Sequence, residues 1–176
     1  MADLKKRRHA REWAVQLLFQ LDMNPETGLE EALAAFWRQL SACRRDELAD
    51  AETGRTVADT EAPPLSEEAE IDALAPAKLR LFAEGLVRGA VANRGAIDEK
   101  LSAYTQNWPL HRMGVVDRNV LRLAIYEMFF GGEVPAVVCI NEAVDLAKFF
   151  SSAESGRFVN GILDRAARDA PRSARR

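Results

Sequence analysis

The sequence predicts an all-α fold without a sheet, and three observations lead to this prediction. Apolar residues recur every three or four positions along most of the chain, which is the period of a helix with one buried face. Proline and glycine residues interrupt these apolar stripes at short intervals. The one run that suits a buried strand, residues 137–140, has no second strand to pair with. Seven helices joined by short turns are therefore expected.

The N-terminal part of the chain contains two of these predicted helices and an acidic segment. The first helix is predicted over residues 7–22 and ends at Asn24-Pro25. A second stripe follows over residues 29–40. Residues 44–66 are rich in acidic side chains and poor in bulky apolar ones, and they include Pro63-Pro64. Such a segment has little surface to bury, so it is predicted to be a disordered acidic insertion.

Five further stripes make up the rest of the predicted fold. Helical order is expected to resume near Pro76, because proline suits a first helical turn. The stripes cover residues 79–90, 97–104, 116–130, 137–150 and 158–163. The third of these is apolar on nearly every side, which predicts that it is the central, most buried helix. The prediction is a single domain over residues 1–176, with a basic tail at 170–176.

The bulk composition excludes several classes of protein. No stretch approaches the roughly 18 apolar residues that a membrane span needs. The charged N-terminus is not followed by an apolar segment, so a secretory signal is not expected. Cys43 and Cys139 are isolated, which does not suit a disulfide framework. The predicted location is the cytoplasm.

Charge is distributed unevenly along the chain. The net charge is −3, but residues 44–72 alone carry ten acidic residues against three arginines. Outside this segment the chain is basic, and both of its ends carry clusters of cations. An acidic total is therefore compatible with a local site for an anionic partner.

Five cations stand where the first predicted helix begins: Lys5, Lys6, Arg7, Arg8 and Arg11. Cations at a helix N-terminus oppose the helix dipole, at a cost of roughly 0.3–1 kcal/mol each. Replacing Arg7, Arg8 and Arg11 by alanine is thus expected to leave thermal stability unchanged or slightly raised. An anionic partner, most simply a nucleic-acid backbone, accounts for their presence. A disordered basic terminus that only aids solubility is the alternative.

The sequence contains no pattern that indicates catalysis, a cofactor or a metal. Glycine-rich phosphate loops and the His-Glu-x-x-His motif are absent, and the histidines and cysteines lack metal-ligand spacing. Glu127, Glu142 and Asp145 form a conceivable carboxylate set, but carboxylates on helices more often cap, pair with arginine or face solvent. Cys139 lies in an apolar run and suits a core position better than a nucleophile. A binding protein rather than an enzyme is predicted, with no catalytic residue, no metal and no cofactor.

Several segments, taken in chain order, resemble the NusB family of bacterial transcription antitermination factors. The matching segments are Arg7-Arg8-His9-Ala10-Arg11-Glu12, then Asp117-Arg118-Asn119-Val120-Leu121-Arg122-Leu123-Ala124-Ile125-Tyr126-Glu127, then Ile140-Asn141-Glu142-Ala143-Val144-Asp145-Leu146-Ala147-Lys148, and finally Phe158-Val159-Asn160-Gly161-Ile162-Leu163-Asp164. The resemblance covers most of residues 7–166, and its last two segments are long and specific.

The resemblance implies two packed three-helix bundles with seven helices in all. It implies binding to the single-stranded boxA element of nascent ribosomal-RNA leader transcripts. The partner would be NusE, which is also a small-subunit ribosomal protein. That heterodimer would seed a complex on RNA polymerase that suppresses termination.

Carried over by position, the resemblance assigns roles to single residues. Arg7, Arg8, His9 and Arg11 fall on the arginine-rich RNA-binding motif, and Lys6 belongs to the same charged run. Tyr104 and Phe158 fall near RNA contacts, and Glu154 falls on an acidic position that tempers RNA affinity. Asp117 maps to the surface that faces NusE. Because Tyr104 and Phe158 also lie on apolar stripes, a core position is an equal alternative for both. Asp117 is alternatively a first-turn acid that favours its own helix.

Two other functions remain as alternatives. The same helical fold serves as the RNA-binding domain of an rRNA cytosine methyltransferase family, which needs a glycine-rich cofactor loop and a Pro-Cys motif that this sequence lacks. The other alternative is a structural helical dimer in which the basic terminus is incidental. A homodimer is also left open for the RNA-binding protein.

Overall fold

The computed structural model describes residues 2–52, 66–105, 108–132 and 134–171. These residues form eight α-helices and one short 3₁₀ helix, and they contain no strand. The helices are α1 (Ala2–Met23), α2 (Leu29–Glu52), α3 (Glu67–Leu74), α4 (Ala77–Ala92), α5 (Arg94–Tyr104), η1 (Leu110–Arg112), α6 (Val115–Phe129), α7 (Ala136–Phe150) and α8 (Ala153–Arg168). The all-α prediction is confirmed for the described residues, but the expected number of seven helices is wrong.

The additional helix is α3, which the apolar stripes did not predict. The Oγ of Ser66 accepts a hydrogen bond from the backbone N–H of Ala69 at 3.3 Å, and this N-cap starts the helix before Pro76. The backbone of α2 also stays helical through Glu52, within the segment predicted to be a disordered insertion from residue 44. The rest of that predicted insertion, residues 53–65, lies outside the described residues.

Helix α1 begins earlier than predicted. It starts at Ala2 instead of residue 7, so Arg7, Arg8 and Arg11 follow its first turn. The effect of the helix dipole falls off within the first turn. The predicted dipole penalty therefore does not apply to these three arginines in the way that the sequence suggested.

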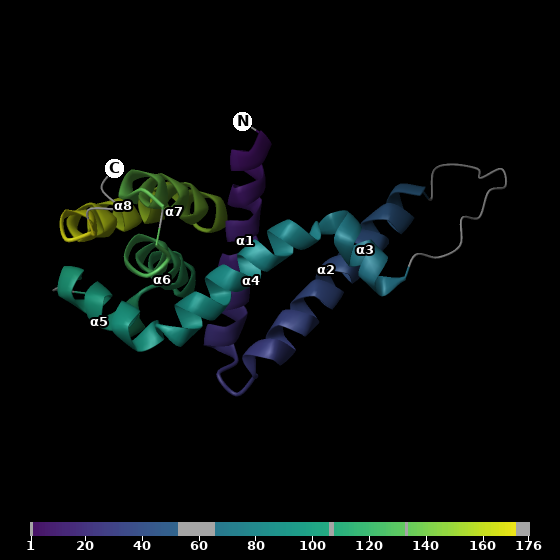
Figure 1. Ribbon diagram of the computed structural model, residues 1–176, viewed down its shortest axis with the longest axis horizontal. Helices are drawn as coiled ribbons and strands as arrows, with labels where there is room; N and C mark the ends of the chain where they lie inside the picture. The colour runs from purple at the N-terminus through teal and green to yellow at the C-terminus, as the bar shows by residue number, and fades with distance from the viewer. Residues whose placement is uncertain (1, 53–65, 106–107, 133, 172–176) are drawn as a thin grey trace.

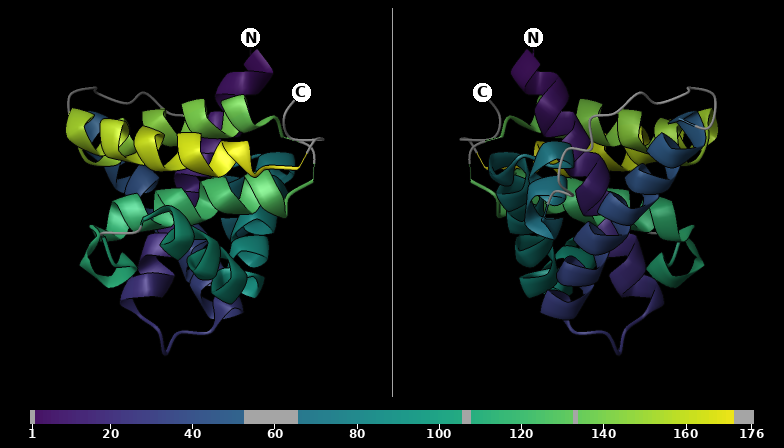
Figure 2. Two further views of the ribbon diagram at one scale, coloured as in Figure 1. Left: turned by 90° about the vertical axis from the view of Figure 1, so that its left-hand side faces the viewer. Right: turned by 90° about the vertical axis from the view of Figure 1, so that its right-hand side faces the viewer.

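Helix α1 stands upright near the middle of the molecule (Figure 1). Helices α5 to α8 lie on one side of it, α2 and α3 lie on the other, and α4 crosses beside it; Figure 2 shows the same arrangement from two further sides. Helices α7 and α8 pack side by side, and α6 contacts α1, α4, α5, α7 and α8. The division into two three-helix bundles remains a prediction.

Helix α6 is the most buried helix of the described part, as its sequence predicted. Its apolar side chains from Val120 to Ile125, together with Met128, are almost fully enclosed. Three polar residues of α6, namely Asn119, Arg122 and Glu127, are buried as well. Such groups need partners inside the protein, so α6 also organises the ionic contacts described below. None of the described helices has the length and apolar character needed to cross a membrane.

Candidate nucleic-acid interface

The cations of α1 divide into exposed and enclosed groups. Lys6 and Arg7 are exposed to solvent, and the guanidinium of Arg7 lies 5.8 Å from the centre of the Phe82 ring. A cation over an aromatic face is held weakly and remains accessible to a ligand. Among the described residues, no carboxylate lies within ion-pair distance of either Lys6 or Arg7. These two side chains form the accessible positive surface of α1.

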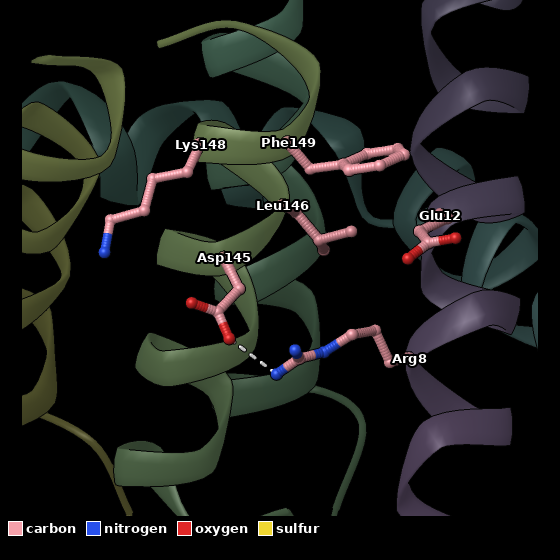
Figure 3. A pocket seen from close by; sticks show the side chains of 6 residues that line it. All are labelled: Arg8, Glu12, Asp145, Leu146, Lys148 and Phe149. Atoms are coloured by element: carbon pink, nitrogen blue, oxygen red, sulfur yellow. Dashed lines mark ion pairs between the residues drawn. The ribbon is translucent and has the colours of Figure 1, made fainter. Parts of the chain in front are cut away.

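Arg8 connects α1 to α7. Its Nε and Nη2 atoms donate to the carboxylate of Glu142 at 3.3 and 3.1 Å, and Nη2 also lies 2.6 Å from Oδ2 of Asp145 (Figure 3). The hydrogen bonds to Glu142 raise the pKa of Arg8 above its ordinary value. The Arg8 side chain is nevertheless partly open to solvent, so one face of its guanidinium can still meet a ligand.

Arg11 is only 4% exposed, which does not suit the predicted role of a direct RNA contact. Its Nε and Nη2 atoms donate to the two oxygens of Glu127 at 2.7 to 3.2 Å, in a fork that joins α1 to α6. Burial works to lower the pKa of Arg11, but the hydrogen bonds and charge of Glu127 outweigh it and raise that pKa. We therefore assign Arg11 a structural role. The expectation that its loss leaves stability unchanged is not supported.

His9 is exposed on the same helix. Its Nδ1 lies 2.8 Å from Oε2 of Glu12, and its ring meets the Trp13 ring edge-on with 4.5 Å between centres. The contact with Trp13 holds the imidazole at the surface beside the first turns of α1. His9 is thus placed next to the accessible cations.

The three predicted RNA-binding residues outside α1 differ in exposure. Tyr104 is half-buried, and its hydroxyl donates to Asp169 at 3.0 Å; burial and this bond raise the pKa of Tyr104. Phe158 is half-buried and packs against the core. Glu154 is exposed in the first turn of α8, 2.7 Å from Arg157. Both aromatic side chains therefore pack against the core and remain partly accessible to solvent.

Asp117 lies in the first turn of α6 and faces the start of α8. Its Oδ2 accepts a hydrogen bond from the Ser155 hydroxyl at 3.1 Å. Its Oδ1 is buried, and no group of the described residues bonds to it. Burial raises the pKa of Asp117, and the single bond from Ser155 only partly opposes this. The ionised form of the Asp117 carboxyl is therefore unfavourable at this position.

The structure also contains an ionic network that the sequence reasoning missed, at the far end of α1. The carboxylate of Asp22 lies 2.5 Å from Arg94, 2.5 Å from Arg118 and 3.2 Å from Arg122. Asp98 binds Arg122 from the other side at 2.7 and 2.9 Å. Burial works to raise the pKa of Asp22, but the hydrogen bond from Arg118 and the charges of the three arginines lower it. The arginines come from distant parts of the chain, so no local pattern signals the network.

The described residues show no arrangement suited to metal binding, and the buried cysteine does not suit thiol chemistry. No group of three or more His, Cys, Asp or Glu side chains within the described ranges could hold a metal ion. The thiol of Cys139 is buried, and burial raises its pKa to about 12. A thiol in this state is a poor nucleophile, as expected of a core residue.

The fold and this surface define an all-helical protein in which α1 carries accessible cations, Lys6 and Arg7, next to the buried ion pair of Arg11 and Glu127. The NusB family model matches residues 55–168. The transcription antitermination protein NusB of Anaeromyxobacter sp. (strain Fw109-5) is 39% identical over 97% of this chain and 96% of its own length. The chain belongs to the NusB family.

Solved structures agree with this assignment. The NusB of T. maritima has a TM-score of 0.69 at 32% identity, covering 96% of this chain and 95% of its own. A crystal structure of antitermination factors NusB and NusE in complex with dsRNA includes a chain with a TM-score of 0.63 at 22% identity. The match covers 96% of this chain and 99% of the chain in that crystal structure, and at 22% identity it supports the fold only.

Proposed function

We propose that this chain is a non-enzymatic transcription antitermination factor that binds single-stranded RNA through α1. The RNA is the boxA element of nascent rRNA leader transcripts, and binding occurs jointly with NusE as part of the RNA polymerase antitermination complex. The observation that carries the proposal is the pair of exposed cations, Lys6 and Arg7, beside the half-exposed Arg8. The names of the relatives, which are transcription antitermination proteins, support it.

The proposed RNA surface differs from the sequence prediction in one residue. Lys6, Arg7, Arg8 and His9 provide the electrostatic part, and Arg11 supports them from the core. Tyr104 and Phe158 are partly accessible and contact bases, while the exposed carboxylate of Glu154 opposes phosphate. Asp117 remains the proposed contact for NusE, in a separate part of the molecule from the α1 cations. The proposed organisation is one domain with an acidic insertion and a basic tail, and a homodimer is compatible with it.

The RNA proposal is tested by measuring the affinity of the full chain for a boxA RNA and for a scrambled RNA of equal length. The double variant Lys6→Ala/Arg7→Ala should bind boxA RNA more weakly, with a salt dependence flatter by about 0.7 for each phosphate that the variant no longer neutralises. Arg38→Ala, which removes an exposed cation from α2, is the matched control. Equal binding of boxA and scrambled RNA, or undiminished affinity of the double variant, would overturn the proposal.

The partner proposal needs a separate measurement. Calorimetric titration of NusE into wild-type protein should show binding, and boxA RNA should bind the pair more tightly than either protein alone, because both proteins contact the RNA. Since coupling is reciprocal, RNA should then raise the affinity for NusE by the same factor. Asp117→Asn should weaken NusE binding and leave RNA binding by the isolated chain intact. An unchanged NusE affinity would remove Asp117 from the interface.

A further inference from the structure

Phe149 on α7 is a large apolar side chain that is 70% exposed. It stands between two hollows of about 410 and 440 Å³ that both lie against α1. The first is lined by Arg8, Glu12, Asp145, Leu146, Lys148 and Phe149. A single exposed apolar side chain is common on protein surfaces, so what points to a ligand is the hollow that Phe149 lines beside the cationic helix and not its exposure alone.

The first hollow is a slot between two helices (Figure 3). Phe149 extends from α7 toward α1 and Glu12, while Arg8 extends from α1 back toward Asp145. Leu146 lies between them at the wall of the slot. The slot therefore has an aromatic ring at one end and a guanidinium at the other.

The Arg8 end of this slot is held by several bonds, and the Phe149 end has one ring contact among the described residues. The Phe149 ring meets the Phe150 ring edge-on, with 4.9 Å between centres, and Phe150 packs against the core. The guanidinium of Arg8 is fixed by Glu142 and Asp145. A planar ligand that enters the slot therefore finds a guanidinium that is already fixed, which lowers the entropy cost of binding at that end.

The chemistry of the slot matches an unpaired nucleobase. A base has a π-face for Phe149 and Arg8. Its amino and imino groups can donate to the second oxygens of the carboxylates of Glu12, which meets His9, and Asp145, which meets Arg8. The slot shares Arg8 with the proposed RNA surface, so a strand whose phosphates meet Lys6 and Arg7 can place a base there. We propose that Phe149 is a stacking platform for one unpaired base of the RNA that α1 binds; this inference rests on the proposed function.

The test uses the full chain and boxA RNAs in which one adenine at a time is replaced by 2-aminopurine, whose fluorescence falls on stacking. Wild-type protein should quench one position strongly, and Phe149→Tyr should retain this quenching. Phe149→Ala should abolish it and bind the RNA about 10-fold more weakly, equivalent to about 1.4 kcal/mol. Its salt dependence should be unchanged because the phenyl ring neutralises no phosphate. Val137→Ala, on the same helix and 61% exposed, is the matched control.

The outcomes separate this inference from the proposed function. If wild-type protein does not bind boxA RNA, the proposed function fails and the inference fails with it. If wild-type protein binds and Phe149→Ala matches it in affinity and quenching, only the inference is overturned. If Phe149→Ala instead weakens NusE binding alone, Phe149 belongs to a protein-docking surface and the inference is again overturned.

Discussion

The two ends of α1 are joined to the rest of the molecule by ionic contacts of opposite polarity. Near its N-terminus, α1 contributes arginines, Arg8 and Arg11, which meet carboxylates of α6 and α7. Near its C-terminus, α1 contributes a carboxylate, Asp22, which meets arginines of α5 and α6. Both networks fix the same helix to α6, but only the first lies beside exposed cations that α1 itself carries, Lys6 and Arg7. A charged run in the sequence can therefore combine residues that hold the fold with residues that remain free for a ligand.

Among the variants that test this comparison, Arg11→Ala should cause the largest loss of stability. It leaves the carboxylate of Glu127 buried without its partner, which costs about 3–5 kcal/mol of stability. Urea unfolding at pH 7 measures the change. The double variant Arg11→Met/Glu127→Leu is the control and should regain most of the loss, because it removes both buried charges. A cost below about 1 kcal/mol for Arg11→Ala would show that water reaches Glu127.

Asp22→Asn should cause the next largest loss, lowering the free energy of unfolding by about 2 kcal/mol at neutral pH. The loss is smaller than for Arg11→Ala because Asp98 still binds Arg122. Its arginine partners lower the pKa of Asp22 below the unfolded value of about 3.9. The stabilisation is therefore present above about pH 4 and is lost as the pH falls through the folded pKa. The free energies of unfolding of the wild-type protein and of Asp22→Asn, measured between pH 2 and 7, should become equal at the lowest pH. A constant difference over this range would contradict the role of the Asp22 charge.

Asp117→Asn should raise stability slightly at neutral pH. Burial raises the pKa of Asp117, so the protonated carboxyl is accommodated at low pH and the cost appears as the pH rises through the folded pKa. The gain for the variant, below about 1 kcal/mol, should thus grow from pH 3 to pH 7. Melting temperatures across this range provide the measurement. Destabilisation at pH 7 would indicate that the favourable position in the first turn of α6 outweighs burial.

Arg7→Ala should have the smallest effect on stability, within about 0.5 kcal/mol, because the side chain is exposed. Compared with Arg11→Ala, it separates the two kinds of arginine on α1 by urea unfolding alone. If both variants lose similar stability, Arg7 contributes to the fold through its contact with Phe82.

Local periodicity predicted much of the architecture from the sequence. The stripes of α4 to α8, the burial of α6 and the core position of Cys139 follow from which residues repeat at the helical period. The same reasoning missed α3 and the first turn of α1, because both contain few bulky apolar residues and so lack a stripe. The exposure of Phe149 could have been found, since the buried positions of α7 (Ala136, Cys139, Ala143, Leu146 and Ala147) leave residue 149 off their face.

By itself, the sequence determined the helical class, the central helix, the family and the presence of a cationic helix. Only the tertiary structure decided which cations remain free. Arg7 and Arg11 are alike in type and lie one helical turn apart, yet Glu127 meets Arg11 alone, from 116 residues away. Because residues four apart share one face of a helix, that distinction depends on how far along α1 the packing against α6 extends, and local spacing does not encode it. The same holds for Asp22 and its arginines, whose attraction acts only after the helices have assembled.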